Sequence, residues 1–220
     1  LSGCSRLKKF PEVVGNMSRL LKLSLNETAI TGLPLSIEHL IGLIELDLRD
    51  CKNFLSLLNS CYSSMSLKSL NLSGCSKLVK LPENLGNIET LEELDVSGTA
   101  ITGLPLSIEH LIGLIKLDLR DCKNLSSLPN GCYSSMSLQI LNLSGCSKLD
   151  ELPKNLGKIE GLEELDLSGT AITDLPSFVV HLKNLKGLSL SGCVGLSSNK
   201  LTRFPLMQLR RSPDPTGMLE

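Results

Sequence analysis

The stretch LEELDVSGTAI, residues 91–101, decides the fold, because its arrangement of leucines recurs along most of the chain. The shared pattern is L-x-x-L-x-L-x-x-(C/T), and consecutive copies begin 23 or 24 residues apart. The copies begin at Leu20, Leu43, Leu67, Leu91, Leu114, Leu138, Leu162 and Leu185. A fixed period of this length is the signature of a protein built from stacked structural units. We therefore expect about eight full units, preceded by a partial first unit, over residues 1–200.

Within one unit, the alternation of Leu94, Asp95 and Val96 predicts a short strand with the two apolar side chains inward and Asp95 outward. The turn at residues 97–99 ends this strand. Further on, Pro105 suits the first position of a helical turn, because its ring fixes φ and its missing N–H needs no partner there. A single unit cannot bury its own leucines, so its neighbours must stack on both sides.

Stacked strands of this kind form a parallel sheet with about 4.8 Å between neighbours. Bulkier segments on the opposite side spread the units apart on that side. The fold class that we predict is α/β: a curved, right-handed, horseshoe-shaped solenoid. Its parallel sheet forms the concave face, and short helical or 3₁₀ turns form the convex face.

The ninth position of each unit lies where the chain leaves the strand, and it is always Cys or Thr. These residues are Thr28, Cys51, Cys75, Thr99, Cys122, Cys146, Thr170 and Cys193. Both side chains are small and offer one hydrogen-bond donor to a buried turn, whose backbone groups need partners. We expect them to form a structural ladder through the solenoid.

A longer repeat lies on top of the short one. Residues 31–44 and 102–115 both read TGLPLSIEHLIGLI, and residues 70–78 and 141–149 both read LNLSGCSKL. The offset is 71 residues throughout. This indicates that a block of three units was duplicated.

The composition excludes several function classes. The formal net charge is −1, which gives no reason to expect binding to nucleic acid or to an anionic membrane. No apolar run approaches the roughly 20 residues that a membrane span needs. The chain opens at Leu1-Ser-Gly-Cys4, in the middle of a unit, so we expect it to be part of a longer protein. The absence of a signal peptide is then uninformative.

The cysteines and histidines do not predict a metal site. There is no C-x-x-C, and besides the ladder and Cys4 the remaining cysteines, Cys61 and Cys132, lie in the repeated segment CYSSMS. We expect reduced thiols in a reducing compartment, although a disulfide between Cys51 and Cys75 is an alternative. The only histidines are His39, His110 and His181. They are 71 residues apart, which places them three units apart, about 14 Å, too far for one metal ion to bridge.

No catalytic or cofactor motif is present. The sequence contains neither a G-x-x-x-x-G-K-(S/T) phosphate loop nor G-x-G-x-x-G. Equivalent Ser, His and Asp residues are strung along the solenoid, whereas catalysis needs groups that converge. We therefore expect no enzyme activity, no metal and no cofactor in this chain.

The outward strand positions are rich in charge. Over the eight units they carry six positive and twelve negative side chains, a net −6, so the rest of the chain is net +5. The candidate partner-binding residues are Glu45, Asp47, Arg49, Glu92, Glu93, Asp95, Lys116, Asp118, Arg120, Glu163, Glu164 and Asp166. The column of outward acids could serve solvation alone, because one-sided sheets need polar outer residues. It could also form an acidic track for a basic protein partner, and it disfavours nucleic acid.

The region from Leu201 loses the repeat pattern. Its segment RRSPDPTG, residues 210–217, is polar and interrupted by prolines. We interpret residues 201–220 as an irregular tail or a linker between repeats.

The repeat words resemble a known family. LNLSGCSKL followed by LEELD-x-SGTAI, at Leu67–Ile101 and again at Leu138–Ile172, is similar to the leucine-rich-repeat region of plant intracellular immune receptors, in particular those with a TIR domain and a nucleotide-binding switch. The resemblance implies a cytoplasmic or nuclear module that senses a pathogen effector, or a guarded host protein, and that holds the nucleotide-binding domain inactive. ADP or ATP would then bind only in that absent domain.

Two other functions stay open. The chain could be a free-standing intracellular scaffold, such as the substrate-binding part of a ubiquitin-ligase adaptor. It could also be a secreted receptor ectodomain, since N-x-(S/T) sequons occur at Asn16, Asn26, Asn71, Asn124 and Asn142. Asn71 and Asn142 however arise from the repeat word itself.

Overall fold

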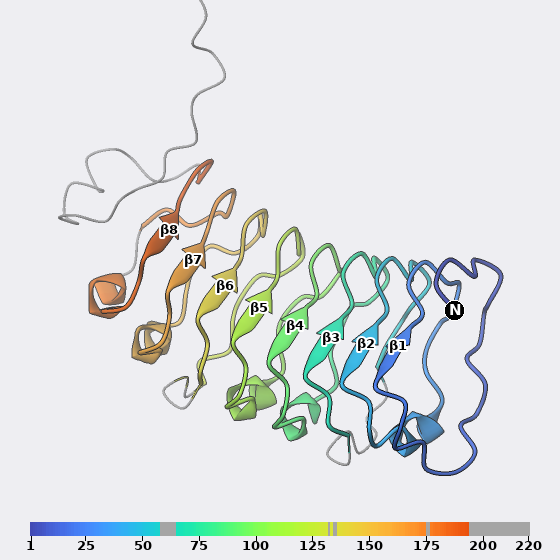
Figure 1. The fold of residues 1–220 in the computed structure, drawn as a ribbon. Helices are drawn as coiled ribbons and strands as arrows, with labels where there is room; N and C mark the ends of the chain where they lie inside the picture. Colours follow the sequence, from blue (N-terminus) through green and yellow to red (C-terminus); the bar gives the residue numbers. More distant parts are fainter. Residues whose placement is uncertain (58–64, 132, 134–135, 175–176, 194–220) are drawn as a thin grey trace, which may run out of the picture.

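The computed structural model describes residues 1–57, 65–131, 133, 136–174 and 177–193. Cys61, Cys132 and the predicted tail at residues 201–220 lie outside these residues. Within them the chain winds into a solenoid, and Figure 1 shows its strands side by side along one face of an arched ribbon. The predicted solenoid with a parallel sheet is confirmed.

Each strand is three residues long, and the strands form one parallel sheet in chain order. They are β1 (Lys22–Ser24), β2 (Glu45–Asp47), β3 (Ser69–Asn71), β4 (Glu93–Asp95), β5 (Lys116–Asp118), β6 (Ile140–Asn142), β7 (Glu164–Asp166) and β8 (Gly187–Ser189). The register is constant: Leu46 pairs with Leu70, and Leu70 pairs with Leu94. Equivalent residues of successive units therefore lie in straight columns across the sheet.

The strands form here because alternate residues meet different surroundings. In the fourth unit Leu94 and Val96 are buried, whereas Asp95 is half-buried on the outer side of the sheet. The middle leucine of every strand from β2 to β8 is buried, together with the apolar residue two positions later in most units. This alternation is the one predicted for a strand with one buried face.

On the opposite side the described turns are 3₁₀-helical. They are η1 (Leu35–His39), η3 (Leu85–Asn87), η4 (Leu106–His110), η6 (Lys154–Lys158) and η7 (Ser177–His181). Side chains such as Ile108 and Leu111 return from these turns to the core, where each is at most 1% exposed. Stacked 3₁₀ turns occupy the convex face, as Figure 1 shows.

The position predicted for Pro105 is wrong by one residue. Pro105 is the N-cap of η4, with φ −65° and ψ 151°, and the helical turn begins at Leu106. Its fixed φ suits extended backbone as well as helix. Its carbonyl accepts the hydrogen bond from the Ile108 N–H at 3.1 Å, so the proline caps the turn without entering it.

Candidate protein-binding face

The concave face consists of the outward residues of β1–β8 and the residue that precedes each strand. Two columns run across it at the first and third strand positions, as fixed by the register. The third position holds Asp47, Asn71, Asp95, Asp118, Asn142 and Asp166, which we call the Asx column. The structure thus brings the predicted acidic residues onto one surface.

The Asx column has a structural role that the sequence analysis missed. In each of its six residues the side-chain oxygen Oδ1 accepts a hydrogen bond from the backbone N–H two residues later, at 2.9–3.1 Å. Asp and Asn side chains stabilise turns in this way. The sequence contained a signal for this role, because only Asp or Asn occupies this position in the six units. The column therefore ends the strands and directs the chain into the ladder turn.

Two acids of the column are also neutralised within their own unit. The Arg49 guanidinium donates to both carboxylate oxygens of Asp47, at 3.0 and 3.1 Å. Arg120 donates to Asp118 at 3.0 Å. Burial alone would raise the pKa of Asp47, but the hydrogen bonds and charge of Arg49 outweigh burial and lower it.

Asp118 departs from the prediction that it belongs to the accessible working surface. Only 4% of this residue is exposed, because the Arg120 side chain pairs with its carboxylate and the sheet encloses it. Arg49 and Arg120 lie beyond the strand ends, in the turns, and fold back onto these acids.

Three further ion pairs join neighbouring units. The Lys22 Nζ lies 2.6 Å from Glu45, Lys68 lies 2.7 Å from Glu92, and Lys186 lies 2.7 Å from Glu163. These side chains are largely exposed, so each pair contributes at most about 1 kcal/mol to stability. The pairs leave the net −6 of this face unchanged, so the excess negative charge lies on side chains that have no ion-pair partner among the described residues.

The strand charges without an ion-pair partner among the described residues are concentrated between β4 and β7. Among the described residues, no cation lies within ion-pair distance of Glu93, Asp95, Glu164 or Asp166, and no acid lies within that distance of Lys116. Glu93 and Glu164 are exposed, and the two aspartates are half-buried.

The ladder residues lie in one buried row. Each Thr hydroxyl donates to the carbonyl three residues earlier, as Thr99 does to Val96 at 2.7 Å. Each Cys thiol donates to a carbonyl of the preceding unit, as Cys122 does to the same Val96 carbonyl at 3.1 Å. The Thr99 Oγ1 and the Cys122 Sγ lie 3.4 Å apart. Thr therefore satisfies its own turn, whereas Cys joins two units.

The described cysteines are free thiols. Desolvation raises the pKa of Cys75 and of Cys146 to about 12, and it also raises the pKa of Cys122. A neutral thiol is a poor nucleophile and metal ligand, so these side chains serve packing. Cys4, at the same position of the first unit, is exposed, because no described unit covers it.

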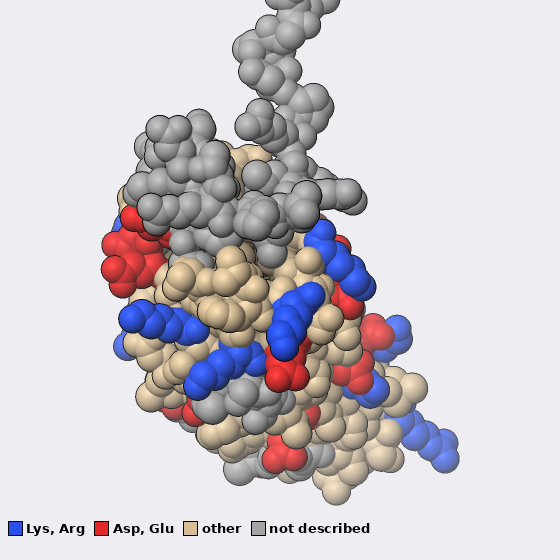
Figure 2. Space-filling model, turned by 90° about the vertical axis from the view of Figure 1, so that its left-hand side faces the viewer, with Lys and Arg blue, Asp and Glu red and all other residues tan. Residues whose placement is uncertain are grey.

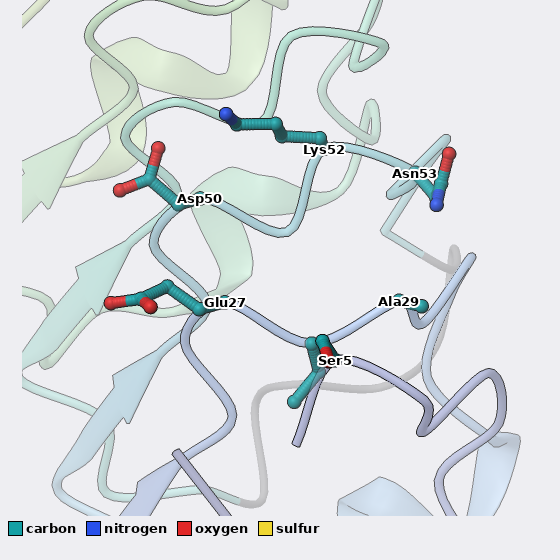
Figure 3. A pocket seen from close by; sticks show the side chains of 7 residues that line it. Ser5, Glu27, Ala29, Asp50, Lys52 and Asn53 are labelled. Carbon is teal, nitrogen blue, oxygen red and sulfur yellow. The ribbon is translucent and has the colours of Figure 1, made fainter. Parts of the chain in front are cut away.

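A pocket of about 450 Å³ lies at the rim where the first two strands end. Ser5, Glu27, Asp50, Lys52 and Asn53 line it together with Thr28 and Ala29. In Figure 3 the carboxylates of Glu27 and Asp50 point to one side of the pocket, and Asn53 lies at the other. Both acids have left-handed backbone, with φ 57° and 54°, at a position that glycine holds in most units.

No convergent catalytic centre is found in the part of the chain that the structure describes. There, no group of three or more His, Cys, Asp or Glu could hold a metal ion. His39, His110 and His181 each end a separate 3₁₀ turn. Figure 2, a view of the β8 end, shows Lys and Arg interspersed with Asp and Glu over the described surface there, without a continuous basic patch.

The comparisons with known proteins agree with this architecture. Residues 1–80 match the family model described as "Disease resistance protein RPS4B-like, leucine-rich repeats", and residues 137–159 match the Leucine Rich Repeat model. Among solved structures, the leucine-rich repeat domain of the type III effector XopL is similar with a TM-score of 0.69 and 31% identity, over 78% of this chain and 61% of that one. The chain is a leucine-rich-repeat solenoid, a fold that generally serves protein binding.

The curated relatives narrow the class. Disease resistance-like protein DSC1 of Arabidopsis thaliana is 40% identical over 59% of this chain, and TMV resistance protein N of Nicotiana glutinosa is 38% identical over 56% of it. Disease resistance protein RPS4B of Arabidopsis thaliana is 33% identical over 59% of this chain. These repeats are therefore similar to the leucine-rich repeats of plant disease resistance proteins.

The match covers only part of those relatives. The chain spans 11% of DSC1, 11% of protein N and 12% of RPS4B. No helix among the described residues is long and apolar enough to cross a membrane.

Proposed function

We propose that this chain is the protein-recognition module of an intracellular plant immune receptor. Its concave face senses a pathogen effector, or a host protein that the effector alters, and also holds a nucleotide-binding domain inactive. The observation that carries the proposal is one eight-stranded parallel sheet with polar outward side chains, built from repeats that are similar to those of plant disease resistance proteins. Polar groups arrayed on a rigid sheet are suited to recognising a protein surface.

Other features support this proposal. The unpaired charge on the concave face is mostly acidic, which disfavours nucleic acid as a partner. The free, buried cysteines suit the reducing cytoplasm or nucleus. The repeats themselves need no cofactor, so ADP or ATP would bind in a nucleotide-binding domain elsewhere in the receptor.

The full-length transcript gives the first test. We expect a nucleotide-binding domain in the same open reading frame, whereas an F-box or RING domain there would contradict the proposal and favour a ubiquitin-ligase adaptor. The second test measures binding of this chain to that nucleotide-binding domain. Glu93→Lys/Glu164→Lys should weaken the complex, and the off-face variant Asp150→Lys/Glu151→Lys should not. Equal affinity in all three chains would refute an autoinhibitory contact through the concave face.

A further inference from the structure

The concave face is divided by charge into a neutralised part and an unpaired part. At β2 the acids Glu45 and Asp47 are paired with Lys22 and Arg49. At β4 and β7 the same tripeptide, Glu-Leu-Asp, has no cationic partner among the described residues. The tripeptide alone therefore does not determine the electrostatic potential of the surface. Its charge is available to a ligand only where no neighbouring cation pairs with it.

The two unpaired acid pairs flank a different surface. In the first-position column, Glu93 is followed by Lys116, then by Ile140, then by Glu164. Ile140 is a half-buried apolar side chain that points outward in a column otherwise occupied mainly by charged residues. The equivalent residue in the first block is Ser69, so the fold does not require an apolar side chain here.

A small hollow adds shape to this surface. It measures about 100 Å³ and lies between β3 and β5, with Glu93, Asp95 and Lys116 in its lining together with Ser69 and Asn71. Its volume suits the end of one long side chain. With two carboxylates and one amide oxygen nearby, a guanidinium or an ammonium group fits it by charge.

We propose that the surface between β4 and β7, here called the acid-flanked face, binds a basic segment of a protein partner. The acid-flanked face consists of Glu93, Asp95, Lys116, Ile140, Glu164 and Asp166. The segment carries two cationic residues about 14 Å apart, the span of three strand spacings, with an apolar side chain between them. This inference rests on the proposed function and specifies the chemistry of the partner.

The distance sets the sequence of the bound segment. On an extended chain, cations about 14 Å apart are four residues apart, and the apolar residue takes the one same-side position between them. Ile140 lies one strand spacing from Glu164 and two from Glu93, so this position is the nearest to it on that side. On a helix, which rises 1.5 Å per residue, side chains eleven residues apart share one face and lie about 16.5 Å apart, the same-face spacing nearest to 14 Å. The proposal therefore defines two synthetic peptides, one extended and one helical, each with two arginines and a leucine at these spacings.

The experiment measures binding of both peptides to the chain by fluorescence anisotropy at low and high salt. We expect at least one peptide to bind more than tenfold tighter than a scrambled peptide of the same composition, with affinity that falls as salt rises. Glu93→Gln/Asp95→Asn and Glu164→Gln/Asp166→Asn should each weaken binding about tenfold. Asn keeps the turn hydrogen bond of the Asx column, as Asn71 and Asn142 do, so folding is preserved.

The control is Asp150→Asn/Glu151→Gln, which removes the same charge from two exposed residues outside the concave face. It should change the affinity less than twofold. If neither peptide is preferred over its scrambled form, or if the control weakens binding as much as the face variants, the inference is wrong. If the peptides fail but Glu93→Lys/Glu164→Lys still weakens binding to the receptor's own nucleotide-binding domain, the proposed function stands and only the basic-segment inference is lost.

Discussion

The two copies of the duplicated block, residues 31–101 and 102–172, share a core and differ at the surface. Among the positions that the structure describes in both copies, two buried pairs differ, Phe54 against Leu125 and Val96 against Leu167, and all four side chains are fully buried. On the concave side Glu45, Lys68 and Ser69 become Lys116, Gln139 and Ile140. On the outer turns Lys80 and Glu83 become Glu151 and Lys154, which reverses both charges.

This comparison separates what the fold needs from what a partner reads. The packing of one unit against the next fixes the leucines, the ladder and the Asx column, because each contacts the neighbouring unit or its own turn. The other outward side chains have no such constraint. The same backbone therefore carries Glu45, Lys68 and Ser69 in one copy and Lys116, Gln139 and Ile140 in the other, and the acid-flanked face takes residues from both.

The largest effect should come from the shared core. Leu70→Ala and Leu141→Ala remove equivalent leucines, each 2% exposed, from the middle of β3 and β6. Each should lower the free energy of unfolding by about 2–5 kcal/mol, since the surrounding units cannot close the cavity. Urea denaturation followed by circular dichroism measures it. If the free energy of unfolding falls more than twice as far for one variant as for the other, the two cores are not equivalent.

A reciprocal exchange sharpens the contrast between the two faces. Ile140→Ser should weaken binding of the better arginine–leucine peptide about tenfold, equivalent to about 1.4 kcal/mol, because the apolar contact is lost. Ser69→Ile, which makes the converse change in the first block, puts an apolar side chain in the lining of the hollow beside Glu93, so it should not tighten binding. Titration of both variants gives the result. Tighter binding to Ser69→Ile would show that apolar area alone governs affinity.

The Asx column should be equally important in both copies. Asp95→Ala and Asp166→Ala each remove the acceptor for a backbone N–H at 2.9 Å, at a cost of about 1 kcal/mol. Asp95→Asn and Asp166→Asn should be nearly neutral, because asparagine makes the same contact at residues 71 and 142. Thermal unfolding distinguishes the two outcomes. If Asn costs as much as Ala, the charge is what stabilises the turn.

The last effect is absent at neutral pH and appears only at alkaline pH. In the folded chain the thiols of Cys75 and Cys146 have a pKa of about 12, against 9.0 for an unperturbed thiol. The unfolded chain therefore loses these protons first, and stability should fall as pH rises from about 9 to about 12. Cys75→Ser/Cys146→Ser keeps a donor that does not ionise in this range, so its decline should be shallower. Identical slopes would show that the thiols do not contribute.

Much of the fold was predictable because it follows from periodicity. The spacing of leucines fixed the units, and the alternation around Leu94 fixed the inward side of the strand. Charge pairing was not predictable, because Lys22 and Glu45 are separated in sequence and meet only through the sheet register. The burial of Asp118 likewise depends on how Arg120 folds back, which residue type alone does not determine.

Site-specific photo-crosslinking tests the central claim most directly. A photoreactive phenylalanine analogue is placed at residue 140 on the acid-flanked face, at residue 22 on the neutralised part, or at residue 106, whose leucine is 66% exposed on the convex side. With the bound arginine–leucine peptide, we expect strong crosslinking from residue 140 and little from residues 22 and 106. Crosslinking that is strongest from residue 106 would contradict a concave binding surface.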